Sequence, residues 1–177
     1  MTSTSLGIDC YLGLGSNLNN PINQLNTGIQ HLNKLRQTQV IGISNFYRSE
    51  PWGVIDQNDF VNAVVKINTR LKPKQLLKEV EKIEYRLMQR QNSARWHSRV
   101  IDIDLLLCGH ETMNRDDLKL PHPWISERCF VIQPLSELKP ILPTDLTRKI
   151  THHRKNHQCS SQLIKINKPK ITGFKGN

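Results

Sequence analysis

Hydrophobic and polar positions alternate along the first part of the chain in a way that predicts a strand followed by a helix. Residues 8–14 form a short apolar run of strand-forming side chains, and Gly15-Ser16-Asn17 ends it. Asn20 followed by Pro21 is typical of a helix start. Beyond it, apolar residues recur every three or four positions, which predicts a buried helix face made of Ile22, Leu25, Ile29, Leu32 and Leu35.

The same two patterns return in the middle of the chain. Residues 40–47 and 60–69 alternate in the manner of strands, and a second apolar helix face follows Pro73. Residues 100–108 form another strand, and residues 128–138 form a short helix. The order of these elements predicts an α+β fold with a ferredoxin-like βαββαβ core, in which helices cover one face of an antiparallel sheet.

Charge is unevenly distributed along the 177 residues. The chain has 25 Lys and Arg against 15 Asp and Glu, a net charge of +10, which favours a polyanionic partner such as nucleic acid, a membrane surface or a phosphorylated substrate. Eight of the basic residues and no acidic residue lie in 148–177. We therefore expect one domain over residues 1–147 and a basic, partly disordered C-terminal extension over residues 148–177.

The lack of a recognisable targeting signal and the spacing of the cysteines both favour a cytoplasmic protein. No apolar run is long enough to cross a bilayer, and the N-terminus lacks the basic-then-apolar pattern of a secretory signal, so no membrane partner is expected. The four cysteines are widely spaced, which argues against a disulfide framework, and Cys10 and Cys108 are expected in the core. His152, His153, His157 and Cys159 form a metal-like cluster without a second half at ligand spacing, so no metal is expected there.

The chemistry-bearing feature is a pair of aspartates in the strand at residues 100–108. Side chains alternate faces along a strand, so Asp102 and Asp104 point the same way, roughly 7 Å apart at their Cα atoms. Two such carboxylates suit Mg²⁺, which is held by a few carboxylates and by phosphate oxygens. The alternative is an exposed sheet face on which Arg95 or Arg99 forms salt bridges with the aspartates.

Neighbouring residues favour a phosphate site. Arg95 and Arg99 precede the aspartates, and His122 and Arg128 follow them, and guanidinium groups bind phosphate oxygens in a bidentate manner. There is no GxxxxGK[ST] and no GxGxxG motif, which excludes a P-loop and a Rossmann site. An RNA-binding module of the same fold class is disfavoured, because two aspartates on the central strand would repel the phosphate backbone, and no nucleic-acid partner is expected.

Five blocks in one order carry a family resemblance. They are Leu12-Gly13-Leu14-Gly15-Ser16-Asn17-Leu18, residues 44–53, Phe60-x-Asn62-Ala63-Val64, Arg95-Trp96-x2-Arg99-x2-Asp102-x-Asp104-Leu105-Leu106-Leu107-x-Gly109, and Leu120-Pro121-His122-Pro123-x4-Arg128-x-Phe130-Val131-x2-Pro134-Leu135. Together, over roughly residues 8 to 140, the chain resembles 6-hydroxymethyl-7,8-dihydropterin pyrophosphokinase, a folate-pathway enzyme. The resemblance implies an α/β/α sandwich and an ATP-dependent diphosphotransferase that moves pyrophosphate from ATP to the pterin hydroxymethyl group, releasing AMP.

The resemblance also implies roles for individual residues. Two Mg²⁺ ions would be held by Asp102 and Asp104, with ATP as co-substrate, and the catalytic residues would be Arg90, Arg99, Asp102 and Asp104. The ATP-binding residues would be Glu84, Trp96, Arg99, Leu105, His122 and Arg128. The pterin-binding residues would be Gly15, Ser49, Glu50, Trp52, Phe60, Asn62 and Phe130, with Asn17 supporting the Gly15 turn. The partners implied are these small substrates alone, and the protein is expected to be a monomer.

One segment departs from the family pattern. Gln89 and Gln91 stand where the family usually carries basic residues, and Arg90 lies one position away from each. A neutral glutamine does not supply the charge that stabilises a transferring phosphoryl group. The alternative function is therefore a pterin- and ATP-binding paralogue with weakened catalysis.

Overall fold

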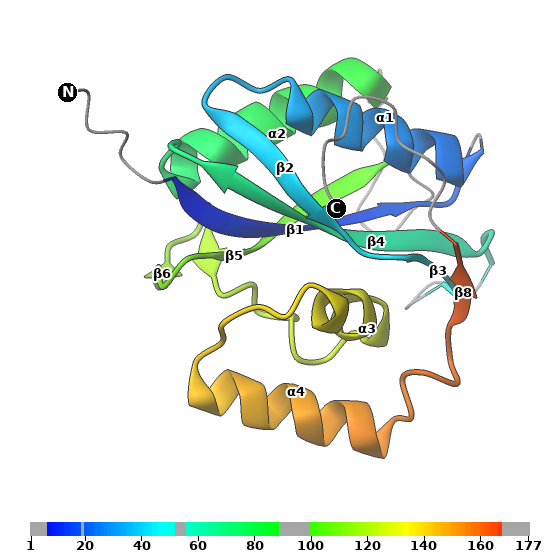
Figure 1. Cartoon of the computed structure of the whole chain (residues 1–177). Coiled ribbons are helices and arrows are strands. Elements are labelled where there is room, and N and C mark those ends of the chain that lie inside the picture. Colours follow the sequence, from blue (N-terminus) through cyan, green and yellow to red (C-terminus); the bar gives the residue numbers. More distant parts are fainter. Residues whose placement is uncertain (1–6, 19, 52–55, 89–99, 168–177) are drawn as a thin grey trace.

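The computed structural model describes residues 7–18, 20–51, 56–88 and 100–167 and contains one main sheet with helices on both of its faces (Figure 1). The strands are β1 (Ile8–Ser16), β2 (Thr38–Ile43), β3 (Phe46–Ser49), β4 (Phe60–Thr69), β5 (Asp102–Cys108), β6 (Met113–Asn114), β7 (Lys119–Leu120) and β8 (Ile164–Ile166). The helices are α1 (Pro21–Asn33), α2 (Pro73–Met88), α3 (Cys129–Glu137) and α4 (Thr144–Asn156).

The six-stranded sheet is antiparallel throughout and has the order β5-β1-β4-β3-β8, with β2 also paired to β4. In the register of this sheet, Gly15 of β1 lies opposite Asn62 of β4 on one side and opposite Asp102 of β5 on the other. Gly13 lies opposite Asp104 in the same way. Residues paired across antiparallel strands share a face, so both glycines lie on the face that carries the two aspartates.

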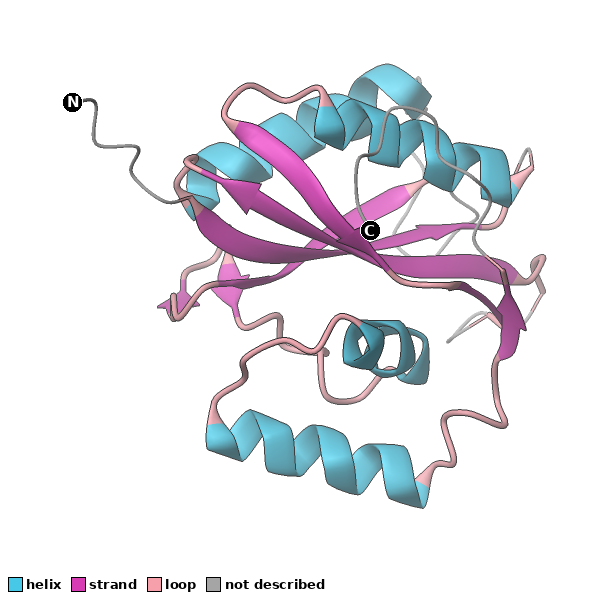
Figure 2. Ribbon diagram, viewed as in Figure 1, coloured by secondary structure: helices cyan, strands magenta, loops and turns pink. Residues whose placement is uncertain are grey.

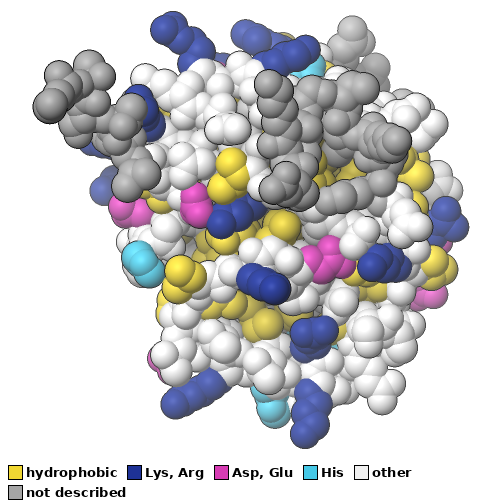
Figure 3. Space-filling view, in the orientation of Figure 1, with side chains coloured by type: hydrophobic (Ala, Val, Ile, Leu, Met, Phe, Trp, Pro, Cys, Tyr) yellow, Lys and Arg dark blue, Asp and Glu magenta, His cyan; other side chains and the backbone are white. Residues whose placement is uncertain are grey.

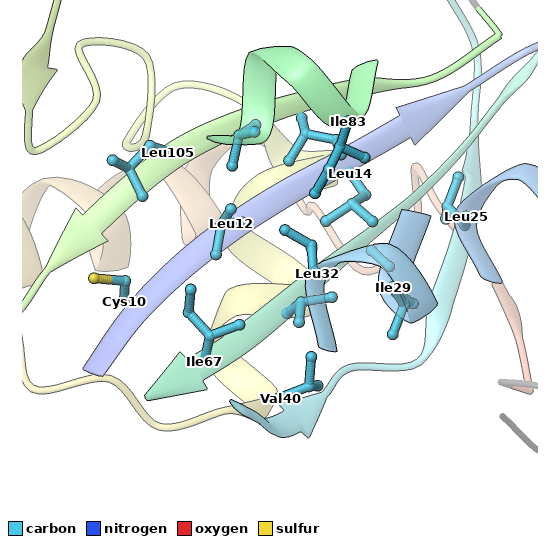
Figure 4. Close-up of a cluster of buried hydrophobic side chains, with 14 of the residues drawn as sticks. Cys10, Leu12, Leu14, Leu25, Ile29, Leu32, Val40, Ile67, Ile83 and Leu105 are labelled. Carbon is cyan, nitrogen blue, oxygen red and sulfur yellow. The ribbon is translucent and has the colours of Figure 1, made fainter. Parts of the chain in front are cut away.

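One hydrophobic core fills the space between the sheet and the α1–α2 layer. Alternate residues of β1 and β5 enter it together with the apolar stripe of α1, as the close-up in Figure 4 shows for Leu12, Leu14, Leu25, Ile29 and Leu105. Asn20 caps α1, since its Oδ1 accepts a hydrogen bond from the Asn23 amide. The sequence predictions of this strand and this helix are confirmed.

A second core lies on the opposite face of the sheet, which α3 and α4 cover. Figure 2 shows these two helices on the side of the sheet away from α1 and α2. Tyr11, Val64 and Leu106 alternate with residues of the first core along their strands and pack against Ile132 and Leu135 of α3. The prediction that the helices of the βαββαβ core cover one face is confirmed by α1 and α2, and the later helices α3 and α4 complete the sandwich that the family resemblance implied. The second face carries too much apolar area to remain in water.

The predicted strand at residues 40–47 is two strands with a break between them. At the break, Ser44 Oγ accepts a hydrogen bond from the Val64 amide at 2.9 Å. The Glu137 carboxylate accepts one from the Asn45 amide at 2.7 Å and another from Asn45 Nδ2 at 3.1 Å. These side chains satisfy main-chain groups that a continuous strand would pair with its neighbour, so the chain bends from β2 into β3.

The basic C-terminal part of the chain continues the fold over its described residues. The expected boundary between residues 147 and 148 falls inside α4, and β8 beyond it pairs with β3. Lys and Arg side chains are spread over the face seen in Figure 3, and those of the described residues do not gather into one patch there. None of the helices in the described part of the chain is long and apolar enough to cross a membrane.

Two disulfides link cysteines that are far apart in sequence. Cys10–Cys108 joins β1 to β5, and Cys129–Cys159 joins the first residue of α3 to the segment after α4. The sequence prediction that the cysteines form no disulfide framework is wrong in this respect. Sequence separations of 98 and 30 residues carry no pairing signal until the fold brings the partners together.

Candidate active site

A cavity of about 450 Å³ lies between the sheet and the first turn of α3. Its floor is formed by β1 at Gly13 and Gly15, and its sides come from β4, β5, α3 and the segment before α3. The cavity exists because β1 carries two glycines where its neighbours carry side chains. A Cβ placed on Gly15 would lie 3.0 Å from Asn62 Oδ1, closer than packed side chains normally allow.

Asp102 and Asp104 line one side of this cavity, while Ile103 between them enters the first core. Across the cavity, Arg128 Nη1 lies 3.9 Å from Asp104 Oδ2, a loose ion pair. The two carboxylates are hard oxygen ligands that face open space, which fits Mg²⁺ together with phosphate oxygens.

Glu84 of α2 lies behind the same strand. Its side chain is buried, and Oε1 accepts a hydrogen bond from the main-chain amide of Ile103 at 2.8 Å. Among the described residues β5 is an edge strand, so Glu84 takes the place of a neighbouring strand as the acceptor for this amide. Glu84 thereby connects α2 to the strand midway between the two aspartates.

Burial keeps His122 neutral. The pKa of His122 is lowered to about 4 by burial and, to a lesser extent, by the positive charge of Arg128, while the charge of Asp102 opposes the shift. The Trp124 amide donates a hydrogen bond to His122 Nδ1 at 3.2 Å. Because Nδ1 accepts, the proton of the neutral ring is on Nε2, and the ring offers a hydrogen-bond donor at neutral pH.

Arg128, the residue just before α3, lies close to two aromatic rings. Its guanidinium carbon lies 5.9 Å from the centroid of the Trp124 ring and 5.8 Å from that of Phe130. Burial lowers the pKa of Arg128, and the charges of Asp104 and Asp102 raise it. An arginine stays charged under such conditions, so a largely buried cation faces the two aspartates.

Another part of the cavity wall is formed by aromatic rings and a side-chain amide. Phe60 and Phe130 both contribute to its wall. Asn62 Nδ2 donates a hydrogen bond to Ser49 Oγ at 2.9 Å, which fixes the orientation of the amide in a buried position. A flat heterocycle with hydrogen-bonding groups on its edge suits such a wall, because its ring can stack on the aromatic faces while the amide forms hydrogen bonds with its edge.

Asn17 connects the Gly15 turn to the loop before β4. Its Nδ2 donates to Gln57 Oε1 at 3.1 Å and to the main-chain oxygen of Asn58 at 3.2 Å. Gln57 lines the cavity, so the buried Asn17 supports one of its walls.

Most residues singled out from the sequence meet at this cavity. Those that line it are Gly15, Ser49, Glu50, Phe60, Asn62, Asp102, Asp104, His122, Arg128 and Phe130. Glu84 and Leu105 do not line it, because the first is buried at the edge of β5 and the second packs into the first core. Trp52, Arg90, Trp96 and Arg99 lie outside the described residues.

Some lining residues were not predicted, among them Gly13, Leu106 and Trp124. Strand alternation carries the signal for Leu106, which lies two positions from Asp104 on the same face. Gly13 likewise lies two positions from Gly15. Trp124 has no comparable signal, because it belongs to an irregular segment whose position depends on the tertiary fold.

Comparison with known proteins identifies similar sequences. Residues 11–140 match the 7,8-dihydro-6-hydroxymethylpterin-pyrophosphokinase (HPPK) family. A 2-amino-4-hydroxy-6-hydroxymethyldihydropteridine pyrophosphokinase of Haemophilus influenzae is 40% identical over 167 residues, covering 90% of this chain and 99% of the relative. The enzyme of the same name from Methylorubrum extorquens is 42% identical over 132 residues, covering 75% of this chain and 83% of the relative.

Solved structures with a similar fold include Plasmodium falciparum HPPK-DHPS. The wild-type protein with pterin and p-hydroxybenzoate superposes with a TM-score of 0.64 at 15% identity over 97% of this chain. The A437G/K540E variant gives a TM-score of 0.65 at 14% identity over 93% of this chain. This chain spans about half the length of those chains (47% and 48%), and at such identities the likeness establishes the fold.

Proposed function

Because this chain belongs to the 7,8-dihydro-6-hydroxymethylpterin-pyrophosphokinase family, it transfers pyrophosphate from ATP to hydroxymethyldihydropterin in folate biosynthesis, and we propose that it does so in the cavity between β1, β5 and α3. The observation that carries the proposal is the convergence of two carboxylates, a neutral imidazole, a guanidinium and two phenyl rings on one cavity. Family membership favours this activity over a paralogue that binds the substrates with weakened catalysis.

The phosphate end of the site is the aspartate side of the cavity. Asp102 and Asp104 would hold two Mg²⁺ ions, which neutralise phosphate charge when bound. Arg128 lies 3.9 Å from the Asp104 carboxylate and would bind a phosphate oxygen with a fixed positive charge. His122, neutral with its proton on Nε2, would donate a hydrogen bond to phosphate without adding charge.

The pterin end of the site is the aromatic side. Phe60 and Phe130 would stack on the two faces of the pterin ring, and Asn62, held by Ser49, would hydrogen-bond its edge. Gly15 would bring main-chain groups close to the ring, since it adds no side chain to the floor. Glu50 and Trp52 would complete this end.

The reaction then joins the two ends. The pterin hydroxymethyl oxygen forms a bond to the β-phosphorus of ATP, the bond from that phosphorus to the α,β-bridging oxygen breaks, and AMP leaves with that oxygen. The hydroxyl proton passes to solvent. Arg90 and Arg99 would stabilise charge on the transferring group, and Trp96 would contribute to ATP binding. Leu105, whose side chain packs into the first core, would contribute to ATP binding through its main chain. We propose that the protein acts as a monomer.

Glu84 would act through the strand and not on ATP directly. Its hydrogen bond to the Ile103 amide supports a positioning role, because that amide lies between the two metal-binding positions. A fixed edge of β5 keeps both carboxylates on the cavity side.

The test is an assay for AMP with purified protein, ATP, Mg²⁺ and the hydroxymethyl pterin. We expect AMP, and no ADP, only when all components are present. Asp102→Ala and Asp104→Ala should each abolish turnover, whereas Asp117→Ala, at an exposed position bonded to Lys74, should leave it unchanged. Pterin binding without any AMP would contradict the proposal and favour the weakened paralogue. In that case Gln89→Arg with Gln91→Arg should restore turnover.

A further inference from the structure

A buried sulfur pair lies beside the proposed site and has no role in the reaction. Cys129 and Cys159 form a disulfide, with exposed fractions of 8% and 0%. A ring nitrogen of His153 and the two sulfur atoms all lie within 4.8 Å of one another. Three segments thus meet at one point: the first turn of α3, the last part of α4 and the turn that follows α4.

The bond connects the C-terminal segment to the wall of the cavity. Cys129 is the first residue of α3 and lies between Arg128 and Phe130, both of which line the cavity. Cys159 precedes β8, which pairs with β3. Both cysteines pack in one cluster with Tyr47 and Leu163, and Phe130 lies against it. Motion of the C-terminal segment is therefore coupled by contact to Phe130.

The surroundings of Cys129 favour a reactive thiol when the bond is open. A thiolate at the first position of a helix is stabilised by the helix N-terminus, and Cys129 is the first residue of α3. His153 is close enough to accept the thiol proton. Burial and the neighbouring His157, on which its ring stacks, lower the pKa of His153, which favours the neutral, proton-accepting form of the ring.

We propose that Cys129 and Cys159 form a reversible dithiol–disulfide site that ties the C-terminal segment to the first turn of α3. The oxidant is a low-molecular-weight disulfide such as glutathione disulfide. The Cys129 thiolate attacks one of its sulfurs, which breaks that S–S bond and releases one glutathione thiolate. The Cys159 thiolate then attacks Cys129 in the mixed disulfide and releases the second, so two electrons pass to glutathione for each protein disulfide formed.

The consequence for catalysis rests on the proposed function. In the disulfide form, the start of α3 is held between the sheet and the C-terminal segment, so Phe130 is fixed for stacking. In the dithiol form this restraint is lost, and we expect the KM for the pterin to rise on the order of 10-fold, since small misplacements of binding groups are costly. The value of kcat should change less, because the aspartates belong to β5.

The first experiment requires no activity. The full chain is equilibrated in buffers of varying glutathione and glutathione disulfide, its thiols are trapped by alkylation, and its peptides are identified by mass spectrometry. We expect a Cys129–Cys159 linked peptide that forms and disappears reversibly across the series. Both cysteines staying alkylated in excess glutathione disulfide, or pairing with other cysteines, would overturn the proposal.

A matched pair of variants tests the role of His153. His153→Gln should slow disulfide formation about 10-fold at pH 7 with little change in the final oxidised fraction. His152→Gln is the control, because His152 is exposed on the same helix and bonds Asn156. Equal rates in the two variants would remove His153 from the mechanism.

The same ligand set suits a zinc ion, and the experiment separates that outcome. Reduced protein is dialysed against Zn²⁺, and the bound metal is measured. One tightly bound Zn²⁺ per chain that is lost in Cys159→Ser would make this a metal centre and overturn the disulfide proposal. If the linked peptide forms reversibly but the KM is the same in both forms, the coupling to Phe130 is wrong. Absence of AMP in both forms would instead contradict the proposed function.

Discussion

Replacing Glu84 by alanine deprives the Ile103 amide of its acceptor at the edge of β5. The lost bond is short, at 2.8 Å, and has a carboxylate acceptor in a buried position. Such bonds contribute about 1.5–3 kcal/mol, and an orphaned buried amide costs about 1–3 kcal/mol. We expect a loss of about 2 kcal/mol in the free energy of unfolding, which corresponds to a fall of about 4–8 °C in Tm for a chain of this size.

Activity should fall further than stability alone implies. Without Glu84 the strand is free to shift at the residue between Asp102 and Asp104, and a displacement of about 1 Å at a catalytic group can cost on the order of 10² in rate. Glu84→Gln is the matched control, because its amide oxygen can still accept from Ile103. We expect it to retain turnover within about threefold of the wild type.

The assay follows AMP release at saturating pterin over a range of Mg²⁺ concentrations, at a temperature at which each variant is folded by circular dichroism. The alanine variant should require more Mg²⁺ and show a lower kcat. Wild-type kinetics in Glu84→Ala would refute the positioning role. An equal loss of kcat in Glu84→Ala and Glu84→Gln would show that the negative charge of Glu84 matters and that the hydrogen bond does not.

Three further predictions concern the cavity. The pKa of His122 is lowered from 6.5 to about 4 in the folded state, so the contribution of the neutral ring to the free energy of unfolding should be complete above pH 6.5 and be lost as the pH falls towards 4. Urea unfolding should therefore show a weaker dependence of this free energy on pH in His122→Asn than in the wild type. Gly15→Ala places a Cβ against Asn62 Oδ1 and should weaken pterin binding about 10-fold by titration calorimetry, whereas Gly13→Ala, with its nearest contact at 3.5 Å, should stay within about threefold. Asp104→Asn should raise the Mg²⁺ concentration needed for half-maximal AMP release by at least about 10-fold, and an unchanged requirement would remove Asp104 from the metal site.

The pattern of apolar residues predicted the elements that form the first core, because α1 and α2 repeat apolar residues every three or four positions and the strands are short runs of strand-forming residues. The strands at β1 and β4 and the helices α1 and α2 follow directly from positions such as Leu12, Ile29 and Ile67. The second face was harder to predict. Its apolar residues, such as Val64, alternate with the first set, so each strand looks continuously apolar rather than one-sided.

Residue chemistry indicated the aspartate side of the cavity, since carboxylates are unusual inside an apolar strand, whereas the pterin-binding residues were predicted from the family resemblance. What the sequence did not reveal depends on contacts between distant segments. The break between β2 and β3 is stabilised by Glu137, far along the chain. The Cys129–Cys159 pair and the β8 strand both require the chain to return to the sheet after α4. No local pattern encodes that return.

The pairing of β8 with β3 also bears on how this sheet behaves beside other copies of itself. An open edge strand is a template for association between chains, through its unpaired amides and carbonyls. Here β3 is covered by a strand of only three residues that carries Lys165, and at the other edge the Ile103 amide of β5 is occupied by Glu84. A chain truncated before Ile164 would expose the unpaired main-chain groups of β3. Such a chain should aggregate through that edge before it loses catalytic activity.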